Sequence, residues 1–258
     1  MNLLGKVLLV LAISLFVSSI AWATIDFDGT NDALESSGTT PSLNIGTNFT
    51  VALWFKSDGT GQSQKYLCSY EAKTGGSEQW AVIYEYVDDK VEFFTNNHTG
   101  TAPRTGSQIT IADTNWHHIA YVYDGTEWAY WLDGVQTVIN ANITFNPNAG
   151  ADLSFHIGQS RANGNVVDAN ITDFYVWDSA LSDQEVVILA NSRVKSIGFQ
   201  LATANIQGAW LLDDISDGTT VTASHTFVDL SGNGNDLIGD ISGTSALVAR
   251  AEAVLSYP

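Results

Sequence analysis

The stretch Trp116–Gly134, WHHIAYVYDGTEWAYWLDG, constrains the fold more than any other part of the chain. Along residues 117–123 apolar and aromatic side chains alternate in the period-two pattern of a β-strand. An Asp-Gly pair follows at 124–125, and such pairs tolerate the backbone angles of a tight hairpin turn. A second aromatic run at 127–132 ends at another Asp-Gly pair. Two aromatic strands bounded by Asp-Gly turns predict an antiparallel β protein.

Short runs of the same kind recur along the chain, between clusters of Gly, Asn, Asp, Thr and Ser. Helical periodicity is scarce. The one predicted helix starts at a capping box, with Ser182 as N-cap and Glu185 three residues later. The strands are predicted near residues 25–28, 33–35, 49–56, 64–70, 79–86, 90–95, 108–111, 117–123, 127–132, 135–140, 153–157 and 171–177. This spacing is typical of an all-β sandwich of two antiparallel sheets.

Residues 1–23 are predicted to be a signal peptide that is no part of the fold. Lys6 is their only charged residue, Val7–Val17 is apolar but short for a membrane span, and residues 21–23 (AWA) offer a cleavage site after Ala23. No later segment approaches the length of a membrane span, so we expect no membrane insertion after cleavage. The sequence therefore predicts a secreted or periplasmic protein, and the short signal and acidic composition are typical of bacteria.

The charge of the chain limits its partners. There are 28 Asp and Glu residues against 10 Lys and Arg, which gives a net charge of −18. Such a surface repels phosphate backbones and anionic lipid, so nucleic acid and membranes are not expected as partners, while cations are attracted. Cys68 is the only cysteine, so there is no internal disulfide, and stability must come from core area or from a metal.

Residues 199–258 are poor in large aromatic side chains, with Trp210 and Phe227 as the main ones. Sixty residues with so little to bury do not form an independent core. We therefore predict a domain over 24–198, on which 199–258 dock as extra strands that complete the same sandwich.

Five motifs occur in an order that resembles the LamG-like jelly-roll domains, relatives of laminin G domains, pentraxins and concanavalin A-like lectins and glucanases. They are IDFDGTND at 25–32, FTVALWFK at 49–56, the hairpin already described, ITDFYVWDSALS at 171–182, and GAWLLD at 208–213 with DLSGNGND at 229–236. The resemblance implies a two-sheet antiparallel jelly roll. It is less informative about function, because this architecture carries lectins, adhesins, hydrolases and lyases.

The sequence holds no recognisable catalytic arrangement. Glucanases of this fold carry an E-x-D-x-x-E string on one strand, and no such string is present. His117 and His118 fall in the W-H-H strand, where packed or turn-bonded histidines are expected. Cys68 lies within a strand and is expected to be a buried, unreactive side chain. We therefore predict that the protein is not an enzyme.

The resemblance implies a structural Ca²⁺ site where the first strand lies beside the late strand. Its ligands would be Asp28 and Asp32 of the acidic opening loop and Asp173 of the late strand. The alternative is that the opening loop is an Asp-Gly turn that caps its own backbone.

A second calcium candidate lies in the loop near the C-terminus. Asp229, Asn233 and Asp240 fit positions 1, 5 and 12 of an EF-hand-type loop, with Gly234 at the bend. Position 12 is normally a glutamate, and Ser-Gly-Asn-Gly-Asn can also form a turn by itself.

A sugar platform is the remaining candidate site. Trp80, Tyr84 and Tyr86 share one face of a single predicted strand, and aromatic faces are suited to pyranose rings. The alternative is that this face packs in the core. The leading hypothesis is an exported, non-catalytic module that binds a polysaccharide or glycoprotein, assisted by calcium. The alternative is a structural or adhesive protein that binds other proteins or itself, and a glycoside-active enzyme is third.

Overall fold

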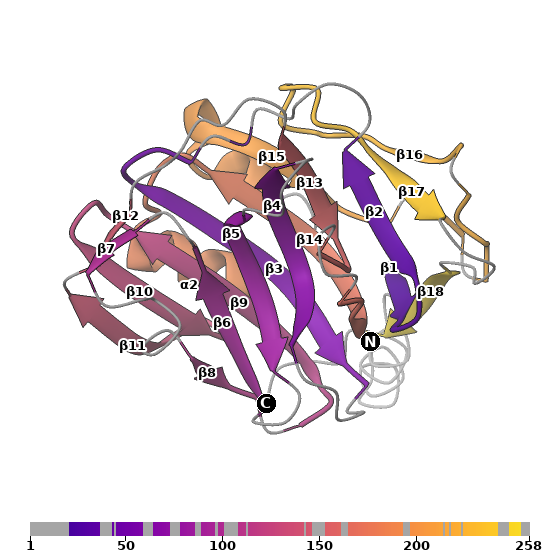
Figure 1. Ribbon diagram of the computed structural model, residues 1–258, viewed down its shortest axis with the longest axis horizontal. Helices are drawn as coiled ribbons and strands as arrows, with labels where there is room; N and C mark the ends of the chain where they lie inside the picture. The colour runs from indigo at the N-terminus through magenta and orange to yellow at the C-terminus, as the bar shows by residue number, and fades with distance from the viewer. Residues whose placement is uncertain are drawn as a thin grey trace, which may run out of the picture.

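The protein is a sandwich of two antiparallel sheets (Figure 1). The computed structural model describes residues 21–36, 43, 45–58, 64–72, 78–85, 89–95, 98–100, 108–111, 113–141, 143–145, 153–160, 165–192, 197–213, 215–216, 218–222, 224–241 and 248–253. The predicted all-β sandwich is confirmed, and each predicted strand coincides with an observed one.

The first sheet, called sheet 1, has the strand order β11-β10-β9-β3-β14-β1-β18, and β15 also pairs with β14. Its strands are β11 (Val135–Ala141), β10 (Glu127–Leu132), β9 (Trp116–Tyr123), β3 (Phe49–Ser57), β14 (Asp168–Trp177), β1 (Ala21–Asp28), β18 (Val248–Ala253) and β15 (Ile206–Trp210). The predicted hairpin is β9–β10, with Trp128 paired to Tyr123 across the turn.

The second sheet, called sheet 2, has the order β16-β17-β2-β13-β4-β5-β6-β8. A separate ribbon pairs β7 (His98–Gly100) with β12 (Ile143–Phe145). The strands of sheet 2 are β16 (Thr226–Phe227), β17 (Leu237–Ile241), β2 (Asp32–Ser36), β13 (Leu153–Ile157), β4 (Lys65–Ala72), β5 (Glu78–Glu85), β6 (Lys90–Phe94) and β8 (Ile109–Thr110).

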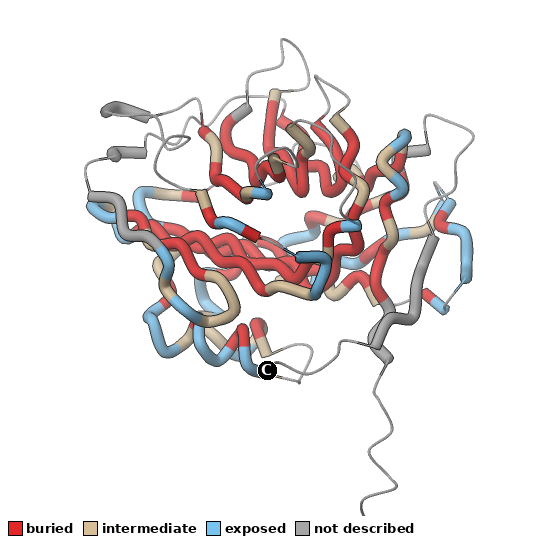
Figure 2. The backbone as a smooth tube through the Cα atoms, turned by 90° about the horizontal axis from the view of Figure 1, so that it is seen from below, coloured by how far each residue is buried: buried red, intermediate tan, exposed pale blue. Residues whose placement is uncertain are grey.

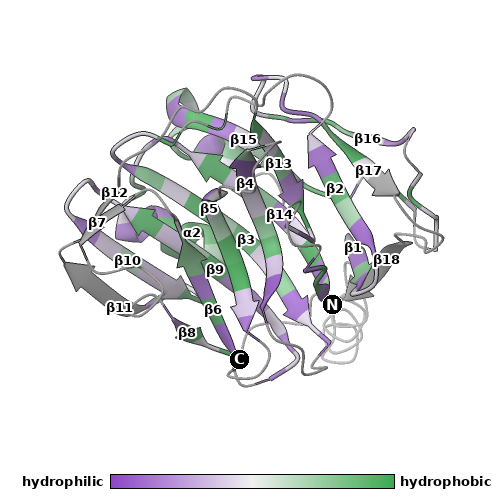
Figure 3. Ribbon diagram, in the orientation of Figure 1, coloured by the Kyte–Doolittle hydropathy of each residue, from purple (hydrophilic) through white to green (hydrophobic). Residues whose placement is uncertain are grey.

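Aromatic side chains fill the space between the sheets. Phe93 of sheet 2 lies 5.2 Å from Phe49 and 5.1 Å from Trp128 of sheet 1, measured between ring centroids. Figure 2 shows the buried strands as two red layers, and Figure 3 shows hydrophobic and hydrophilic residues alternating along several strands. This alternation is the reason for the sandwich, because every second side chain can enter the core.

The helix α2 (Asp183–Asn191) covers the outer face of sheet 1. The Ser182 hydroxyl accepts the Glu185 N–H at 3.4 Å, and the Glu185 carboxylate accepts the Ser182 N–H at 2.8 Å, so the predicted capping box is confirmed. Val186, Leu189 and Ala190 are the buried residues of the helix, and Val186 and Leu189 belong to an apolar cluster with sheet 1. None of the helices that the structure describes could cross a bilayer.

The C-terminal residues contribute strands to both sheets. β15 pairs with β14 in sheet 1, β17 pairs with β2 in sheet 2, and β18 pairs with β1 at the edge of sheet 1 (Figure 1). β1 starts at Ala21, so cleavage after Ala23 would remove three of its residues and leave the pairing with β18 from Thr24 onward.

Candidate functional site

A group of polar side chains lies on the outer face of sheet 2, and we call it the polar face: Glu35, Ser69, Glu71, Ser154 and His156. The register places His156 of β13 opposite Glu35 of β2 on one side and Ser69 of β4 on the other. Ser154 is opposite Glu71 in the neighbouring row. Their strand neighbours are core residues, so the pleat turns these five side chains away from the core.

The two glutamates lie on either side of the histidine ring. His156 Nε2 is 3.7 Å from Glu35 Oε2, and His156 Nδ1 is 4.0 Å from Glu71 Oε1. Hydroxyl groups hold the inner carboxylate, because Ser69 Oγ donates to Glu71 Oε1 at 2.8 Å and Ser160 Oγ donates to Oε2 at 3.5 Å. The polar face is therefore a connected cluster and not a set of separate surface charges.

The polar face is sheltered, with one side open. Glu71 and His156 are 0% and 1% exposed, whereas the Glu35 side chain is 36% exposed. Ser154 Oγ and His156 Nδ1 are buried and have no hydrogen-bond partner among the described residues. Buried polar atoms are normally paired with protein or ordered water, so these two atoms can still accept or donate a hydrogen bond.

An apolar strip continues the polar face across β4, β5 and β6. Ala81 is opposite Ser69, and Phe94 is opposite Ala81. A small apolar cluster, separate from the main core, consists of Tyr66, Ala81 and Ile83 with Phe94 packed against them. Apolar side chains beside a few fixed polar groups are the usual composition of a ligand site. Reasoning from the sequence missed this site, although Ser-x-Glu in β4 and Ser-x-His in β13 place polar residues at alternate positions of apolar strands.

The predicted sugar platform is wrong for Trp80 and Tyr84. Both are 1% exposed, because their strand turns them into the core. The Trp80 ring stacks on Phe93 with centroids 6.1 Å apart, and Tyr84 packs on Phe55 at 5.7 Å. Neither ring offers a face to a ligand. Tyr86 lies outside the described residues.

Of the three predicted calcium ligands in the opening-loop site, the structure brings together Asp28 and Asp32 but not Asp173. β1 lies beside β14 as predicted, but the register pairs Asp28 with Asp168. Asp173 is five residues further along β14, roughly 16 Å at ~3.3 Å per strand residue, so it cannot share an ion with Asp28. The Asp32 carboxylate accepts the Asp28 N–H at 3.1 Å and the Asp28 carboxylate accepts the Thr30 N–H at 2.8 Å, which is the self-capped turn. Burial raises the pKa of Asp32 to about 6.

Asp173 belongs to a different place, a bulge of β14 on the outer face of sheet 1. Its φ of 49° is left-handed, and the pairing of β14 with β3 shifts between Thr172 and Tyr175. The side chain lines a cavity of about 10 Å³ with Trp54, His118, Tyr175, Leu189, Ser192 and Ile197. That space is about the size of one water molecule, so it is no ligand site.

The second predicted calcium loop is filled by its own carboxylate. Asp229 Oδ1 accepts the N–H groups of Ala209 at 3.0 Å and Ser231 at 2.9 Å, and Oδ2 accepts the Ser231 hydroxyl at 2.7 Å and the Asn235 N–H at 3.0 Å. Asn233 Nδ2 donates to the Ile206 carbonyl at 2.8 Å. The donors point inward, so they surround an anion where a cation was predicted. Asp240 lies in β17, and its side chain is outside the described residues.

No three acidic, histidine or cysteine side chains of the described residues gather into a group that could hold a metal ion. The other titratable candidates have structural roles, as predicted. His117 is held between Asp133 at 2.8 Å and Asp113 at 3.0 Å. Burial lowers the pKa of His118 to about 4 and raises the pKa of the Cys68 thiol, so neither is charged near neutral pH.

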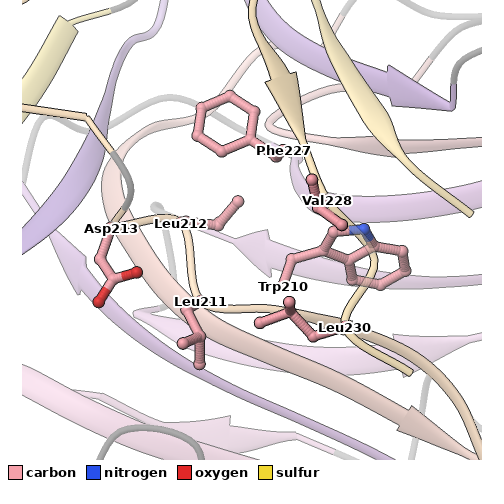
Figure 4. Close-up of a pocket in the computed structure, with 7 residues that line it drawn as sticks. All are labelled: Trp210, Leu211, Leu212, Asp213, Phe227, Val228 and Leu230. Atoms are coloured by element: carbon pink, nitrogen blue, oxygen red, sulfur yellow. The ribbon is translucent and has the colours of Figure 1, made fainter. Parts of the chain in front are cut away.

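An open pocket of about 220 Å³ lies beside the C-terminal strands (Figure 4). The end of β15 and the loop after it form one wall, and β16 with the loop after it forms the other. It is lined by Trp210, Leu211, Leu212, Asp213, Phe227, Val228 and Leu230. In Figure 4 the Asp213 carboxylate stands apart from the apolar side chains, at one side of the pocket. Reasoning from the sequence could not find this pocket, because the residues of its two walls are 14 or more positions apart in the chain.

Comparisons with known proteins bear on the fold. Residues 28–187 match the family model described as "Concanavalin A-like lectin/glucanases superfamily". The human neuronal pentraxin receptor is 26% identical over 161 residues, which cover 58% of this chain and 30% of the receptor. Neuronal pentraxin-2 of Cavia porcellus is 25% identical over 165 residues, which cover 58% of this chain and 36% of that protein. The chain thus spans about a third of the length of these curated relatives.

Two solved structures share the fold. A protein of Bacteroides ovatus, described as a "putative carbohydrate binding protein", gives a TM-score of 0.60 at 13% identity, with 90% of this chain and 60% of that chain covered. The heptameric SAP-like pentraxin of Limulus polyphemus gives a TM-score of 0.51 at 19% identity, with 67% and 83% covered.

Proposed function

The chain belongs to the concanavalin A-like lectin/glucanases superfamily, and from that membership we propose that it is an exported, non-catalytic module that binds an extracellular glycan or glycoconjugate. The proposal takes residues 1–23 as a cleaved signal peptide and the rest as one structural unit, secreted or periplasmic. Its partner is a polysaccharide or the glycan of a glycoprotein.

The polar face of sheet 2 is the observation that carries the proposal. It combines two carboxylates, two serine hydroxyls and an imidazole with an adjoining strip that contains Tyr66 and Phe94. Sugar hydroxyls are recognised by fixed groups of this kind, since a carboxylate accepts from them and a hydroxyl donates or accepts. Ser154 Oγ and His156 Nδ1, which have no hydrogen-bond partner among the described residues, would supply two further hydrogen bonds to a ligand that enters beside Glu35.

The arrangement of the carboxylates favours binding over hydrolysis. A glycosidase needs two carboxylates that flank the sugar bond across open space. Here the imidazole of His156 lies between Glu35 and Glu71, 3.7 Å from one and 4.0 Å from the other. The space in which a glycosidic bond would be cleaved is filled by a side chain.

A glycan array with the exported protein tests the proposal, and Glu71→Gln and His156→Gln are the informative variants. Glu71→Gln keeps the size of the side chain and an acceptor for Ser69 while it removes the charge. We expect its affinity for the glycan that binds to fall about tenfold. Glu127→Gln is the control, because Glu127 is an exposed glutamate at the start of β10 in sheet 1, away from the polar face and its apolar strip. A flat array, or an equal loss in the control, would contradict the proposal.

The assistance by calcium that the resemblance implies is tested separately, by repeating the array in EDTA and in about 2 mM Ca²⁺. The described residues of the polar face offer the ion no third acidic ligand, so we expect binding through Glu71 and His156 to be equal in the two conditions. If glycan binding is lost in EDTA, both the calcium site and the glycan site would have to be assigned to residues outside the polar face.

A further inference from the structure

The pocket of Figure 4 is bordered by aliphatic side chains that are exposed to solvent. Val228 is 54% exposed and Leu230 is 48% exposed, whereas the walls at Trp210, Leu212 and Phe227 are at most 2% exposed. Exposed apolar residues that cluster at a pocket mark an interaction site more often than single exposed residues do.

The loop that carries these two side chains is held rigidly. Asp229 lies between Val228 and Leu230 and points inward, where its carboxylate accepts four hydrogen bonds from Ala209, Ser231 and Asn235. The Leu230 N–H donates to the Ala209 carbonyl at 2.9 Å. Val228 and Leu230 therefore cannot turn inward without breaking this network, and the apolar rim is preformed.

Charge and shape restrict what can fill the pocket. Asp213 is part of the wall, and the sequence continues as DISD at 214–217 within a chain of net charge −18. A second copy carries the same charge and is repelled, whereas a cationic partner is attracted. A sugar ring finds no aromatic face here, because Trp210 is 0% exposed and stacks on Phe155 with centroids 5.2 Å apart.

We propose that this pocket binds a large apolar side chain of a basic peptide segment in a partner protein. The apolar side chain fills the space between Leu212, Phe227 and Leu230, and a neighbouring lysine or arginine of the partner lies at Asp213. The pocket is a second binding site, independent of the polar face, and neither site needs the other to be occupied.

The probe is a fluorescent, end-blocked peptide, Lys-Lys-Leu-Lys-Lys, titrated with the full exported protein and followed by fluorescence anisotropy. We expect binding that weakens about fivefold or more in Leu230→Ser and in Asp213→Asn, and that weakens with added salt. Val135→Ser is the matched control, because Val135 is 65% exposed at the start of β11, the edge strand of sheet 1 far from β15 in the strand order, and it should bind the probe as the parent protein does. Leu230 is half exposed, so an unchanged melting temperature confirms that Leu230→Ser is folded.

Four results would overturn the proposal. A peptide with serine in place of the central leucine that binds equally well would show general attraction to an acidic protein. Absence of binding at millimolar peptide, or equal weakening in Val135→Ser, would show that the pocket takes no such segment. Self-association in sedimentation that Leu230→Ser abolishes would assign the pocket to a second copy of the chain.

Discussion

The two sheets share one core but differ on their outer faces. The outer face of sheet 1 is mainly apolar, and α2 with the following 3₁₀ helix η2 (Ile197–Gln200) packs on it through a cluster that includes Trp131, Tyr175 and Trp177. The outer face of sheet 2 carries Glu71 and His156, both buried, beside a small apolar strip. The two faces are similarly buried and differ in what covers them and in their share of polar groups.

The difference distinguishes side chains that are buried to stabilise the fold from side chains that are buried to form a binding site. An apolar face gains stability when the chain covers it, so a helix on sheet 1 needs no further explanation. Buried polar atoms cost free energy unless they are paired, and on the polar face Ser154 Oγ and His156 Nδ1 have no hydrogen-bond partner among the described residues. The polar face opens to solvent at Glu35, whereas α2 and η2 pack on the outer face of sheet 1, which is why the polar face is the better functional candidate.

The largest effect should come from sheet 1. Trp177 is 0% exposed, and its indole N–H donates to the Leu201 carbonyl at 3.0 Å, so Trp177→Ala removes both packing and a hydrogen bond under the helix. We expect the free energy of unfolding in urea to fall by about 3–5 kcal/mol, with glycan binding unchanged in the protein that remains folded. If Trp177→Ala instead lost glycan affinity without losing stability, the outer face of sheet 1, and not the polar face, would be the binding surface.

This comparison also shows which features of the fold can be predicted from the sequence. Period-two alternation predicted the strands, and the Ser182–Glu185 capping box predicted the one helix, because both signals are local. The same alternation placed Trp80 and Tyr84 on one face but could not say which face enters the core. That choice depends on the opposite sheet.

The register of the strand pairs was the other feature that the sequence could not predict. The family resemblance implied that β1 and the late strand are neighbours, yet the residue opposite Asp28 is Asp168 and not Asp173, since register depends on where each strand starts. The polar face was missed for a related reason. Glu35, Ser69 and His156 come from three strands far apart in the chain and become neighbours only through the order β2-β13-β4.

A smaller effect is expected at Asp32, where the chain passes from sheet 1 to sheet 2. Burial raises the pKa of this carboxyl to about 6 from 3.8, so its contribution to stability is fully present below pH 3.8 and is lost as the pH rises through about 6. At pH 7.5 Asp32→Asn should therefore be more stable than the parent by about 1 kcal/mol, because the amide can accept the Asp28 N–H without a buried charge.

Melting curves at pH 4 and pH 7.5 measure this difference, which should vanish at pH 4. Repeating them in EDTA and in about 2 mM Ca²⁺ adds a control for the ion. A bound calcium would stabilise the charged carboxylate, so a parent protein that gains stability from calcium, while Asp32→Asn does not, would restore the opening loop as a metal site.

The sharpest test of the polar face compares two serines on neighbouring strands. Ser69 Oγ donates to Glu71 at 2.8 Å, whereas Ser154 Oγ has no partner among the described residues. Ser69→Ala leaves a buried carboxylate short of a donor and should lower the free energy of unfolding by about 1–3 kcal/mol. Ser154→Ala removes an unpaired hydroxyl and should leave it unchanged or raise it by less than about 1 kcal/mol.

In the glycan array we expect the larger effect from Ser154, because its hydroxyl has no partner among the described residues and is the group that we propose for a ligand. We expect Ser154→Ala to keep its stability and to lose affinity, a combination that a purely structural hydroxyl does not give. If Ser154→Ala is instead as destabilising as Ser69→Ala, its hydroxyl has a structural partner. The polar face would then be an internal network that fixes the packing of sheet 2, and the contrast between the two outer faces would be one of composition alone.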